Sequence, residues 1–213
     1  MCDIGQGLEN LAWVRQLNGP SSNDPLSIEE WKRVIDEVSS FKPYVSFAGG
    51  EPFLSKNILE LSEYINRKGL TYSNTTNGIL LERYAEDIVR FGMSSLGVSI
   101  TGPKKIHDFI VGVDGAFLKI LNGIEKLEEA KARMGKRRPE LRINYAIFEL
   151  NYPYLEEFAS FLKENIRGKF TVTFTHQYAK TDTMVKNHNR QFGNSFPITT
   201  STYTANPSKV DTE

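Results

Sequence analysis

A glycine pair followed by a carboxylate ends a short apolar segment at residues 45–54, which read Val-Ser-Phe-Ala-Gly-Gly-Glu-Pro-Phe-Leu. The β-branched and aromatic residues predict a buried strand, and Gly49 and Gly50 let the chain turn sharply and a ligand come close. Pro52 biases Glu51 towards an extended conformation. We therefore expect a bare strand end whose Glu51 carboxylate binds an ammonium group. An ordinary strand-to-helix turn is the alternative.

Polar side chains also follow the later predicted strands. Asn77 and Gly78 come after the strand expected at 70–75, and Ser99 lies near the end of the strand expected at 96–100. The Asn77 amide either reaches the same ligand or serves the turn, because Asn-Gly is a strong turn pair. His176 follows the last predicted strand, where it either faces a substrate or makes a structural hydrogen bond.

Helices and strands must alternate along the chain to position these residues. Apolar residues at helical spacing predict helices, and alternating apolar residues predict the strands between them. The expected helices cover 28–38, 57–67, 81–91, 117–127 and 155–162, and the expected strands cover 43–47, 70–75, 96–100, 141–147 and 170–174. This alternation is typical of an α/β fold with a parallel sheet and right-handed connections. The residues above then share the carboxyl edge of the sheet, where such folds bind ligands.

Together these segments resemble the radical S-adenosylmethionine (SAM) enzyme superfamily. Residues 49–52 look like its GGEP motif, and further segments at 76–78, 98–103, 106–108 and 115–117 resemble the family in the same order. Asn151 is a weaker match of the same kind. The resemblance implies a partial (β/α)6 TIM-like barrel, open on one side, of which this chain carries strands two to six with the first strand missing.

The resemblance also implies roles for individual residues. The residues implied to bind SAM are Gly49, Gly50, Glu51, Pro52, Asn77 and Ser99. In the family the GGEP backbone and acid hold the amino group of the methionine moiety, and Ser99 would offer its hydroxyl to the ribose or the carboxylate. Thr101 departs from the pattern, since many relatives carry Asp there, and a hydroxyl cannot act as a base near neutral pH. His107 is expected in a loop as a local hydrogen-bonding residue.

The family's metal signature is incomplete in this sequence. That signature, CxxxCxxC, supplies three thiolates to a 4Fe–4S cluster, whereas this chain has one cysteine, Cys2. Residues 1–6 resemble the end of the signature, with Cys2 as its third ligand. We therefore expect that Met1 is an internal codon and that the first strand and two cysteines are missing from the sequence. An incidental cysteine is the alternative.

The same resemblance divides the chain into two regions. Residues 1–178 are expected to form the radical SAM core. Residues 179–213 are polar, lack a helical stripe and read as a tail or as the start of a truncated C-terminal region. No cysteine-rich segment is present there, so the chain carries no auxiliary cluster motif.

Composition narrows the function classes. Acidic and basic residues balance at 26 each, so no charge excess favours nucleic acid. No apolar run reaches the ~18 residues of a membrane span, and no signal-peptide pattern is visible. We expect a cytoplasmic protein that binds neither nucleic acid nor membranes.

The resemblance implies an enzyme that binds a 4Fe–4S cluster and SAM, cleaves SAM reductively to a 5′-deoxyadenosyl radical and abstracts hydrogen from a substrate that the sequence does not reveal. A flavodoxin- or ferredoxin-type electron donor is the family expectation. The chain as written is expected to be inactive, because two cluster cysteines are absent. The alternative is a cluster-less, non-catalytic protein on the same scaffold that binds a nucleotide or a protein partner. A nicotinamide-dependent oxidoreductase is disfavoured, since no G-x-G-x-x-G turn opens a helix.

Overall fold

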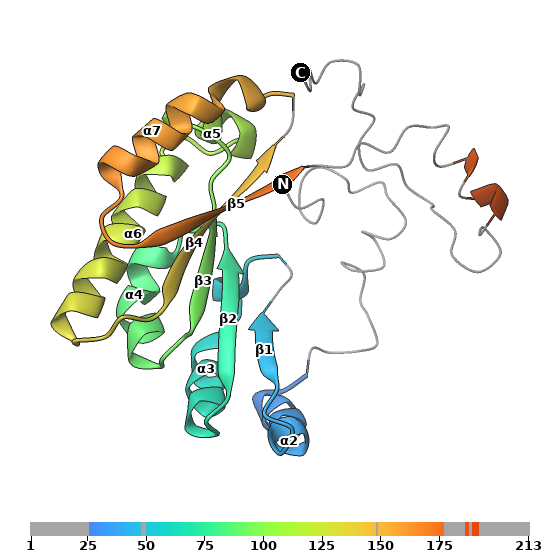
Figure 1. The fold of residues 1–213 in the computed structure, drawn as a ribbon. Coiled ribbons are helices and arrows are strands. Elements are labelled where there is room, and N and C mark those ends of the chain that lie inside the picture. Colours follow the sequence, from blue (N-terminus) through green and yellow to red (C-terminus); the bar gives the residue numbers. More distant parts are fainter. Residues whose placement is uncertain (1–25, 48–49, 148, 177–185, 188, 192–213) are drawn as a thin grey trace.

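The computed structural model describes residues 26–47, 50–147, 149–176, 186–187 and 189–191. Within them, five strands form one parallel sheet in the order β1-β2-β3-β4-β5 (Figure 1). The strands are β1 (Tyr44–Phe47), β2 (Thr71–Thr76), β3 (Ser95–Ser99), β4 (Glu140–Ile147) and β5 (Phe170–His176). Strands that follow one another in the sequence therefore pair with one another in the sheet. The prediction of an α/β fold with five parallel strands is confirmed.

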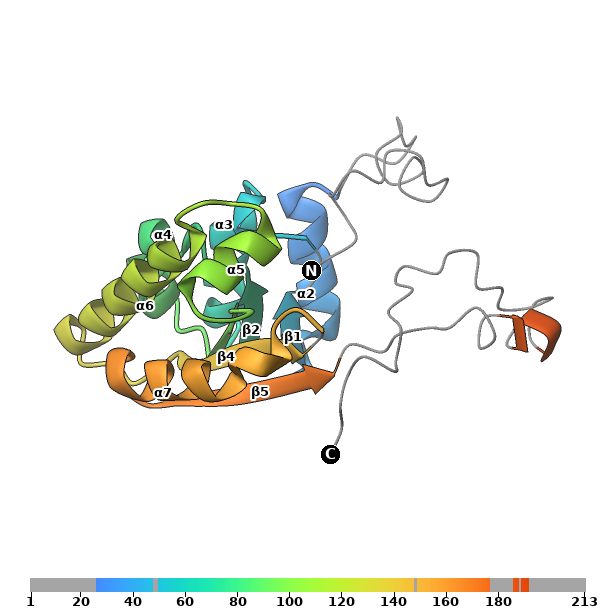
Figure 2. The same cartoon turned by 90° about the horizontal axis from the view of Figure 1, so that it is seen from above.

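Helices connect these strands and lie together on one side of the sheet, and none of the helices named below covers its other side, which we call the open face (Figure 2). They are α2 (Ile28–Ser39), α3 (Ile58–Arg67), α4 (Leu81–Arg90), α5 (Lys104–Val111), α6 (Ala116–Arg133) and α7 (Leu155–Asn165), with short 3-10 helices η1 (Pro52–Leu54) and η2 (Tyr152–Tyr154). No helix within the described ranges is long and apolar enough to cross a bilayer.

The start of α2 follows the rules of helix capping. Ser27 and Glu30 form the reciprocal capping box that begins α2: the Ser27 side chain accepts from the Glu30 backbone, and the Glu30 carboxylate accepts from the Ser27 N–H at 2.7 Å. Two backbone donors that the helix itself leaves unpaired are satisfied in this way. A local four-residue pattern therefore defines this helix start.

One element differs from the expectation. His107 was expected in a loop, but its segment forms α5, which ends at Gly112 in the left-handed conformation. Its buried face consists of His107 and Ile110, so one member of the stripe is polar and eight residues carry too little periodicity to stand out. The same helix buries His107 to 2% exposure.

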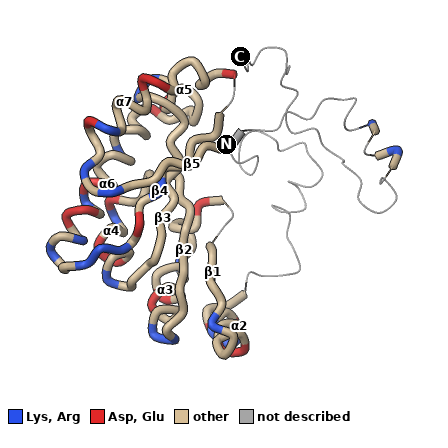
Figure 3. The backbone as a smooth tube through the Cα atoms, in the orientation of Figure 1, with Lys and Arg blue, Asp and Glu red and all other residues tan. Residues whose placement is uncertain are grey.

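The hydrophobic core fills the space between the sheet and the helices. Its most enclosed side chains come from alternate strand positions and from the inner faces of α3, α4, α6 and α7, and include Tyr72, Leu96, Val98, Ile143, Ile65, Leu81, Ile120 and Phe158. Charged residues gather on the helices and the connecting loops, and the strands carry almost none (Figure 3). The packed helix side makes the sheet a rigid support for the residues at its carboxyl edge.

Candidate functional site

Glu51 bridges the carboxyl ends of β1 and β2. It stands before η1 in an extended conformation, with φ −120° and ψ 107°, as the following proline predicts. Its Oε1 accepts from the Thr76 hydroxyl at 2.8 Å and from the Phe53 N–H at 3.2 Å, and its Oε2 accepts from the Asn77 N–H at 2.7 Å. A carboxylate offers about four lone-pair sites, so the oriented group retains capacity for a ligand cation.

Gly50 leaves open space beside this carboxylate. A Cβ built on Gly50 would meet no atom within 4 Å, and its φ does not lie in the left-handed region. Neither packing nor backbone strain within the described chain therefore requires glycine at this position. Bare backbone beside an oriented acid is an arrangement that lets a ligand approach closely.

The turn after β2 explains most of the Thr76-Asn77-Gly78 segment. Gly78 has φ +80°, and a Cβ there would come within 3.0 Å of Ile120 and Val98. The Thr76 hydroxyl accepts from the Gly78 N–H at 3.0 Å, while Asn77 Oδ1 accepts from the Ile79 N–H at 3.0 Å. The turn role of Asn77 is thus present. Its exposed position at the same edge as Glu51 leaves the second role, ligand binding, as an expectation.

Thr76 lies in the family-like segment 76–78, but the sequence assigned it no role at this edge. It is 1% exposed, and its hydroxyl donates to Glu51 while accepting from Gly78. Its place directly before an Asn-Gly turn was visible, but a threonine in a strand is common because of its β propensity. Its pairing with an acid 25 positions earlier gives it a role.

Ser99 ends β3 and lies opposite Asn144 of β4 in the sheet register. It is partly buried and stands one strand away from the end of β2. Because the strands are parallel, Glu51, Asn77 and Ser99 share the carboxyl edge, as predicted. The structure brings these three to one edge, whereas Gly49 and Cys2 lie outside the described residues.

The loop after β3 is held by a buried polar cluster. His107 Nδ1 accepts from the Thr101 N–H at 3.1 Å and lies 3.0 Å from the Thr101 hydroxyl. The Asn151 side-chain NH₂ donates to the carbonyl oxygens of Thr101 at 2.9 Å and Ala146 at 2.7 Å. These contacts fasten the start of α5 to the end of β4, so Thr101, which departs from the family pattern, has a structural partner in His107.

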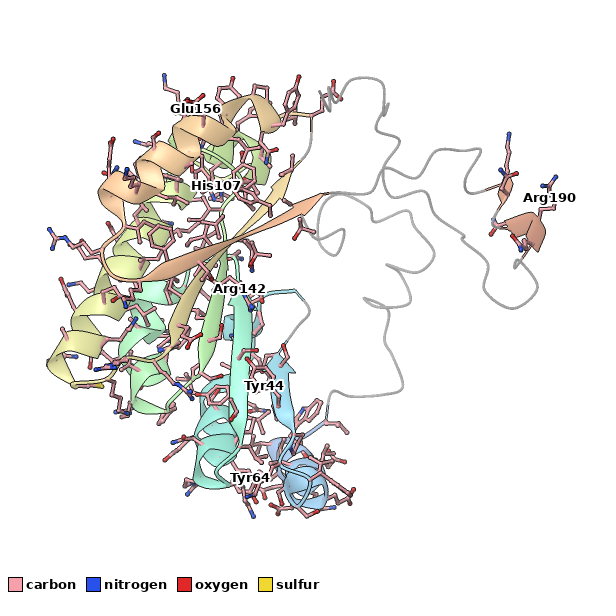
Figure 4. All side chains as sticks on the ribbon, in the orientation of Figure 1. Tyr44, Tyr64, His107, Arg142, Glu156 and Arg190 are labelled. Carbon is pink, nitrogen blue, oxygen red and sulfur yellow. The ribbon has the colours of Figure 1, made fainter. Side chains whose placement is uncertain are left out.

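Burial fixes the protonation of His107. Desolvation lowers its pKa to about 4, and the nearby Asp108 only partly opposes this shift. With Nδ1 accepting from a backbone N–H, the ring is neutral near pH 7 and carries its proton on Nε2. Figure 4 labels His107 among the helices, away from the open side of the sheet. Its local hydrogen-bonding role is therefore confirmed, in a helix instead of a loop.

The other family-like segment after β3 serves the start of α6. The Asp108 carboxylate accepts from the Gly115 N–H at 2.9 Å and from the Phe117 N–H at 2.8 Å. These are donors at the positive end of the helix dipole, where an anion is favoured. Asp108 therefore positions α6, whose residue Ile120 packs beneath the Gly78 turn.

Surface hollows do not select this site. Two hollows among the described residues flank α6, one towards the end of α7 and the other towards the amino ends of β4 and β5. The hydrogen-bonded acid at the carboxyl edge identifies the candidate site instead.

Sequence comparison supplies the family. The Radical SAM superfamily matches residues 1–162. The chain belongs to this superfamily. It is 37% identical over 131 residues to the Fe-coproporphyrin III synthase of Methanosarcina barkeri, covering 59% of this chain and 33% of that protein. It is 38% identical over 104 residues to a probable GTP 3′,8-cyclase of Archaeoglobus fulgidus, covering 45% of this chain and 33% of that protein. The chain thus spans about a third of the curated relatives that it matches.

Solved structures agree on the fold of this radical SAM chain. Streptococcus suis SuiB bound to S-adenosylmethionine matches with a TM-score of 0.58 and 19% identity, over 80% of this chain and 41% of that one. The anSMEcpe enzyme with bound AdoMet and a peptide matches with a TM-score of 0.56 and 20% identity, over 80% of this chain and 54% of that one. The predicted partial TIM-like barrel is therefore confirmed as the architecture.

The family's two cofactors fit the residues of this chain differently. SAM presents an ammonium group, a carboxylate and ribose hydroxyls, and the Glu51 carboxylate and the Ser99 hydroxyl at one edge suit such a ligand. The family's 4Fe–4S cluster needs three cysteine thiolates, and this chain contains one cysteine, Cys2. The described residues contain no group of three His, Cys, Asp or Glu side chains arranged for a metal ion. The residues present therefore do not supply a complete cluster site.

Proposed function

We propose that this chain is part of a radical SAM enzyme and binds SAM at the carboxyl edge of β1, β2 and β3. The observation that carries the proposal is the Glu51 carboxylate, oriented by three hydrogen bonds from the Thr76 hydroxyl and the Phe53 and Asn77 N–H groups. The bare backbone of Gly50 beside it supports the same assignment. A negative group held in one orientation loses little entropy on binding a cation, which favours affinity.

Each residue at this edge receives a binding role in the proposal. Gly49, Gly50, Glu51 and Pro52 hold the methionine amino group, with Glu51 as the anionic acceptor of its charged hydrogen bond. Ser99 donates or accepts at the ribose or the carboxylate, and Asn77 contributes its amide. Thr76 acts through Glu51 by fixing its Oε1. Together these residues orient SAM on the sheet.

In enzymes of this family a reduced 4Fe–4S cluster supplies the electron that cleaves SAM, and the resulting 5′-deoxyadenosyl radical abstracts hydrogen from a substrate. For this chain, Cys2 would supply one thiolate to that cluster. The chain as written should therefore bind no stable cluster by itself. Anaerobic reconstitution followed by iron analysis tests this: close to four irons per chain would contradict it, once gel filtration has excluded oligomers that pool their Cys2 residues.

The relatives do not decide the substrate. By their names, one group consists of a Fe-coproporphyrin III synthase and heme synthases, and the other consists of probable GTP 3′,8-cyclases. These are different chemistries at similar identity, so neither is transferred to this chain. We further propose a cytoplasmic location and a flavodoxin- or ferredoxin-type electron donor, as is usual for enzymes with oxygen-sensitive clusters.

Isothermal titration of the chain with SAM tests the proposed site. Glu51→Gln removes the charge and should weaken SAM binding by about tenfold or more, because a charge-assisted hydrogen bond contributes roughly 1.5–3 kcal/mol. Glu156→Gln is the matched control, since Glu156 is exposed on α7 (Figure 4) and should leave the affinity unchanged. Equal affinities for the wild-type chain and Glu51→Gln would refute the role of Glu51.

The alternative function is a non-catalytic protein on the same scaffold, and the single cysteine favours it. Such a protein would bind a nucleotide or a protein partner without cleaving SAM. Reading the coding frame upstream of the Met1 codon separates the two. An open frame that encodes Cys-x-x-x-Cys directly before Met1 supports the enzyme, whereas a stop codon there supports the non-catalytic protein.

A further inference from the structure

The two faces of the sheet differ in chemistry. Strand residues alternate between faces, and the positions that face the helices are mainly apolar, as in Leu141, Ile143 and Tyr145 of β4. The other positions, on the open side, carry short polar side chains. By register, they include Ser46, Ser73, Thr75, Ser95, Ser99, Asn144, Thr171 and Thr173. Small polar residues on a face that none of the described helices covers leave room for a ligand and supply hydrogen bonds to it.

Within strands β1 to β5, Arg142 is the only lysine or arginine. It is partly buried on the open face of β4, and Figure 4 places it over the middle of the sheet. Among the described residues its side chain makes no hydrogen bond and no ion pair. Glu140, two residues earlier on the same face, is exposed at the amino end of β4 and does not pair with it.

Polar groups lie next to Arg142 in the register. Gly97 of β3 stands opposite Arg142, and Thr171 of β5 lies on its other side. A Cβ on Gly97 would approach Asn144 Nδ2 to 2.6 Å and Thr75 Oγ1 to 3.1 Å. The absence of a side chain at Gly97 therefore lets the Asn144 amide lie across β3 towards Thr75. An amide and a hydroxyl thus lie at Gly97, the register partner of Arg142.

This arrangement fits an anion. Withdrawing a guanidinium from water is unfavourable unless a counter-charge and hydrogen bonds compensate. The planar fork of arginine matches carboxylate and phosphate oxygens two at a time. Asn144 pairs with Ser99 at the carboxyl edge. Arg142 comes two residues earlier on the same strand, so it lies about 6.6 Å from Asn144 towards the amino end of β4. It therefore stands below the edge assigned to SAM.

We propose that Arg142, with Asn144 and Thr75, binds an anionic group of the substrate, a carboxylate or a phosphate, on the open face of the sheet. That this anion belongs to a substrate rests on the proposed function, whereas the anion site itself rests on Arg142 and its neighbours alone. The substrate would then carry a carboxylate or phosphate that reaches two residues along β4 from the cofactor edge towards the amino end of the strand. The carboxylate of SAM itself is the competing anion.

The test titrates the full chain with sodium tripolyphosphate, with citrate and with SAM in separate experiments at constant ionic strength, using calorimetry. Four proteins are compared: wild type, Arg142→Gln, Arg142→Lys and Arg133→Gln. Arg133 pairs with Glu86 on the helix side at 2.6 Å, so its variant matches the loss of charge without touching the open face. Urea unfolding of each variant verifies that it folds cooperatively.

We expect tripolyphosphate or citrate to bind the wild-type chain, Arg142→Gln to weaken that binding at least tenfold, Arg142→Lys to weaken it less, and Arg133→Gln to leave it unchanged. The stronger of the two anions identifies phosphate or carboxylate. No anion binding, or equal losses in Arg142→Gln and Arg133→Gln, would overturn the proposal. So would a loss of SAM affinity in Arg142→Gln with anion binding intact. If SAM fails to bind any protein while the anions bind through Arg142, the proposed function fails and the anion site stands.

Discussion

The carboxylate of Glu51 accepts the backbone N–H of Asn77 at 2.7 Å, across 26 positions of sequence. This contact joins the turn after β1 to the turn after β2, and the Thr76 hydroxyl reinforces it. The acid of the glycine-rich segment is therefore oriented before any ligand binds. A preorganised acceptor of this kind favours binding because little rearrangement is needed.

Thr76→Val should weaken both the fold and the SAM site. The substitution removes the donor to Glu51 and leaves the buried Gly78 N–H without its acceptor, at a cost of about 1–3 kcal/mol for an unpaired buried group. Urea unfolding measures the loss, and calorimetry with SAM measures the effect on binding. Thr71→Val, at the exposed start of β2, is the control and should be nearly neutral. A Thr76→Val chain as stable as the control would show that Glu51 is held by its backbone donors alone.

His107 should make stability depend on pH. Its folded pKa is lowered to about 4 from 6.5 by burial, so between these values the unfolded chain takes up a proton that the folded chain does not. The contribution of His107 to the free energy of unfolding is therefore fully present above pH 6.5. It falls as the pH decreases towards 4, by up to about 3 kcal/mol from this group.

His107→Asn provides the comparison for that measurement. The Asn oxygen can still accept the Thr101 N–H, but it does not titrate in this range. The variant should be less stable at pH 7 and should show a smaller loss between pH 6.5 and 4. Identical slopes for the two proteins in denaturant titrations would assign the pH dependence to other groups.

Asp108→Asn should destabilise the start of α6. The carboxylate accepts the Gly115 and Phe117 N–H groups, and an amide can accept with only one of its two heads. We expect a loss of about 1–2 kcal/mol in the free energy of unfolding. Asp114→Asn is a close control, because Asp114 is exposed beside the same helix start. If both variants lose the same amount, the general helix-dipole effect accounts for it and the direct hydrogen bonds do not.

Gly123→Ala and Asn122→Ala should change stability in opposite directions. Gly123 lies inside α6, where a Cβ would approach Leu81 Cβ to 2.7 Å and the Glu82 N to 3.0 Å. Overpacking against α4 should cost about 1–3 kcal/mol and outweigh the helix preference for alanine of about 1 kcal/mol. Asn122 is exposed, so its replacement should stabilise the chain by a few tenths of a kcal/mol. Thermal unfolding of both variants measures the difference, and a stabilised Gly123→Ala would mean that the two helices separate without cost.

Local sequence patterns determined much of this fold. The strands and most helices were predictable because a packed parallel sheet forces apolar residues into fixed periods. The start of α2 was predictable because its cap lies within four residues. The glycine pair before Glu51 and Pro52 marked the edge for the same reason, since backbone freedom and φ restriction are properties of single residues.

The tertiary structure alone decided which polar residues meet. The Thr76 hydroxyl donates to Glu51, the Thr101 N–H donates to His107, and the sheet register sets Arg142 opposite Gly97. No helical or strand periodicity in the sequence predicts any of these three pairings. Strand register and the face of each strand bring such residues together, and both depend on how the helices pack against the sheet. The types of the binding residues could therefore be read from the sequence, whereas their partners followed only from the assembled sheet.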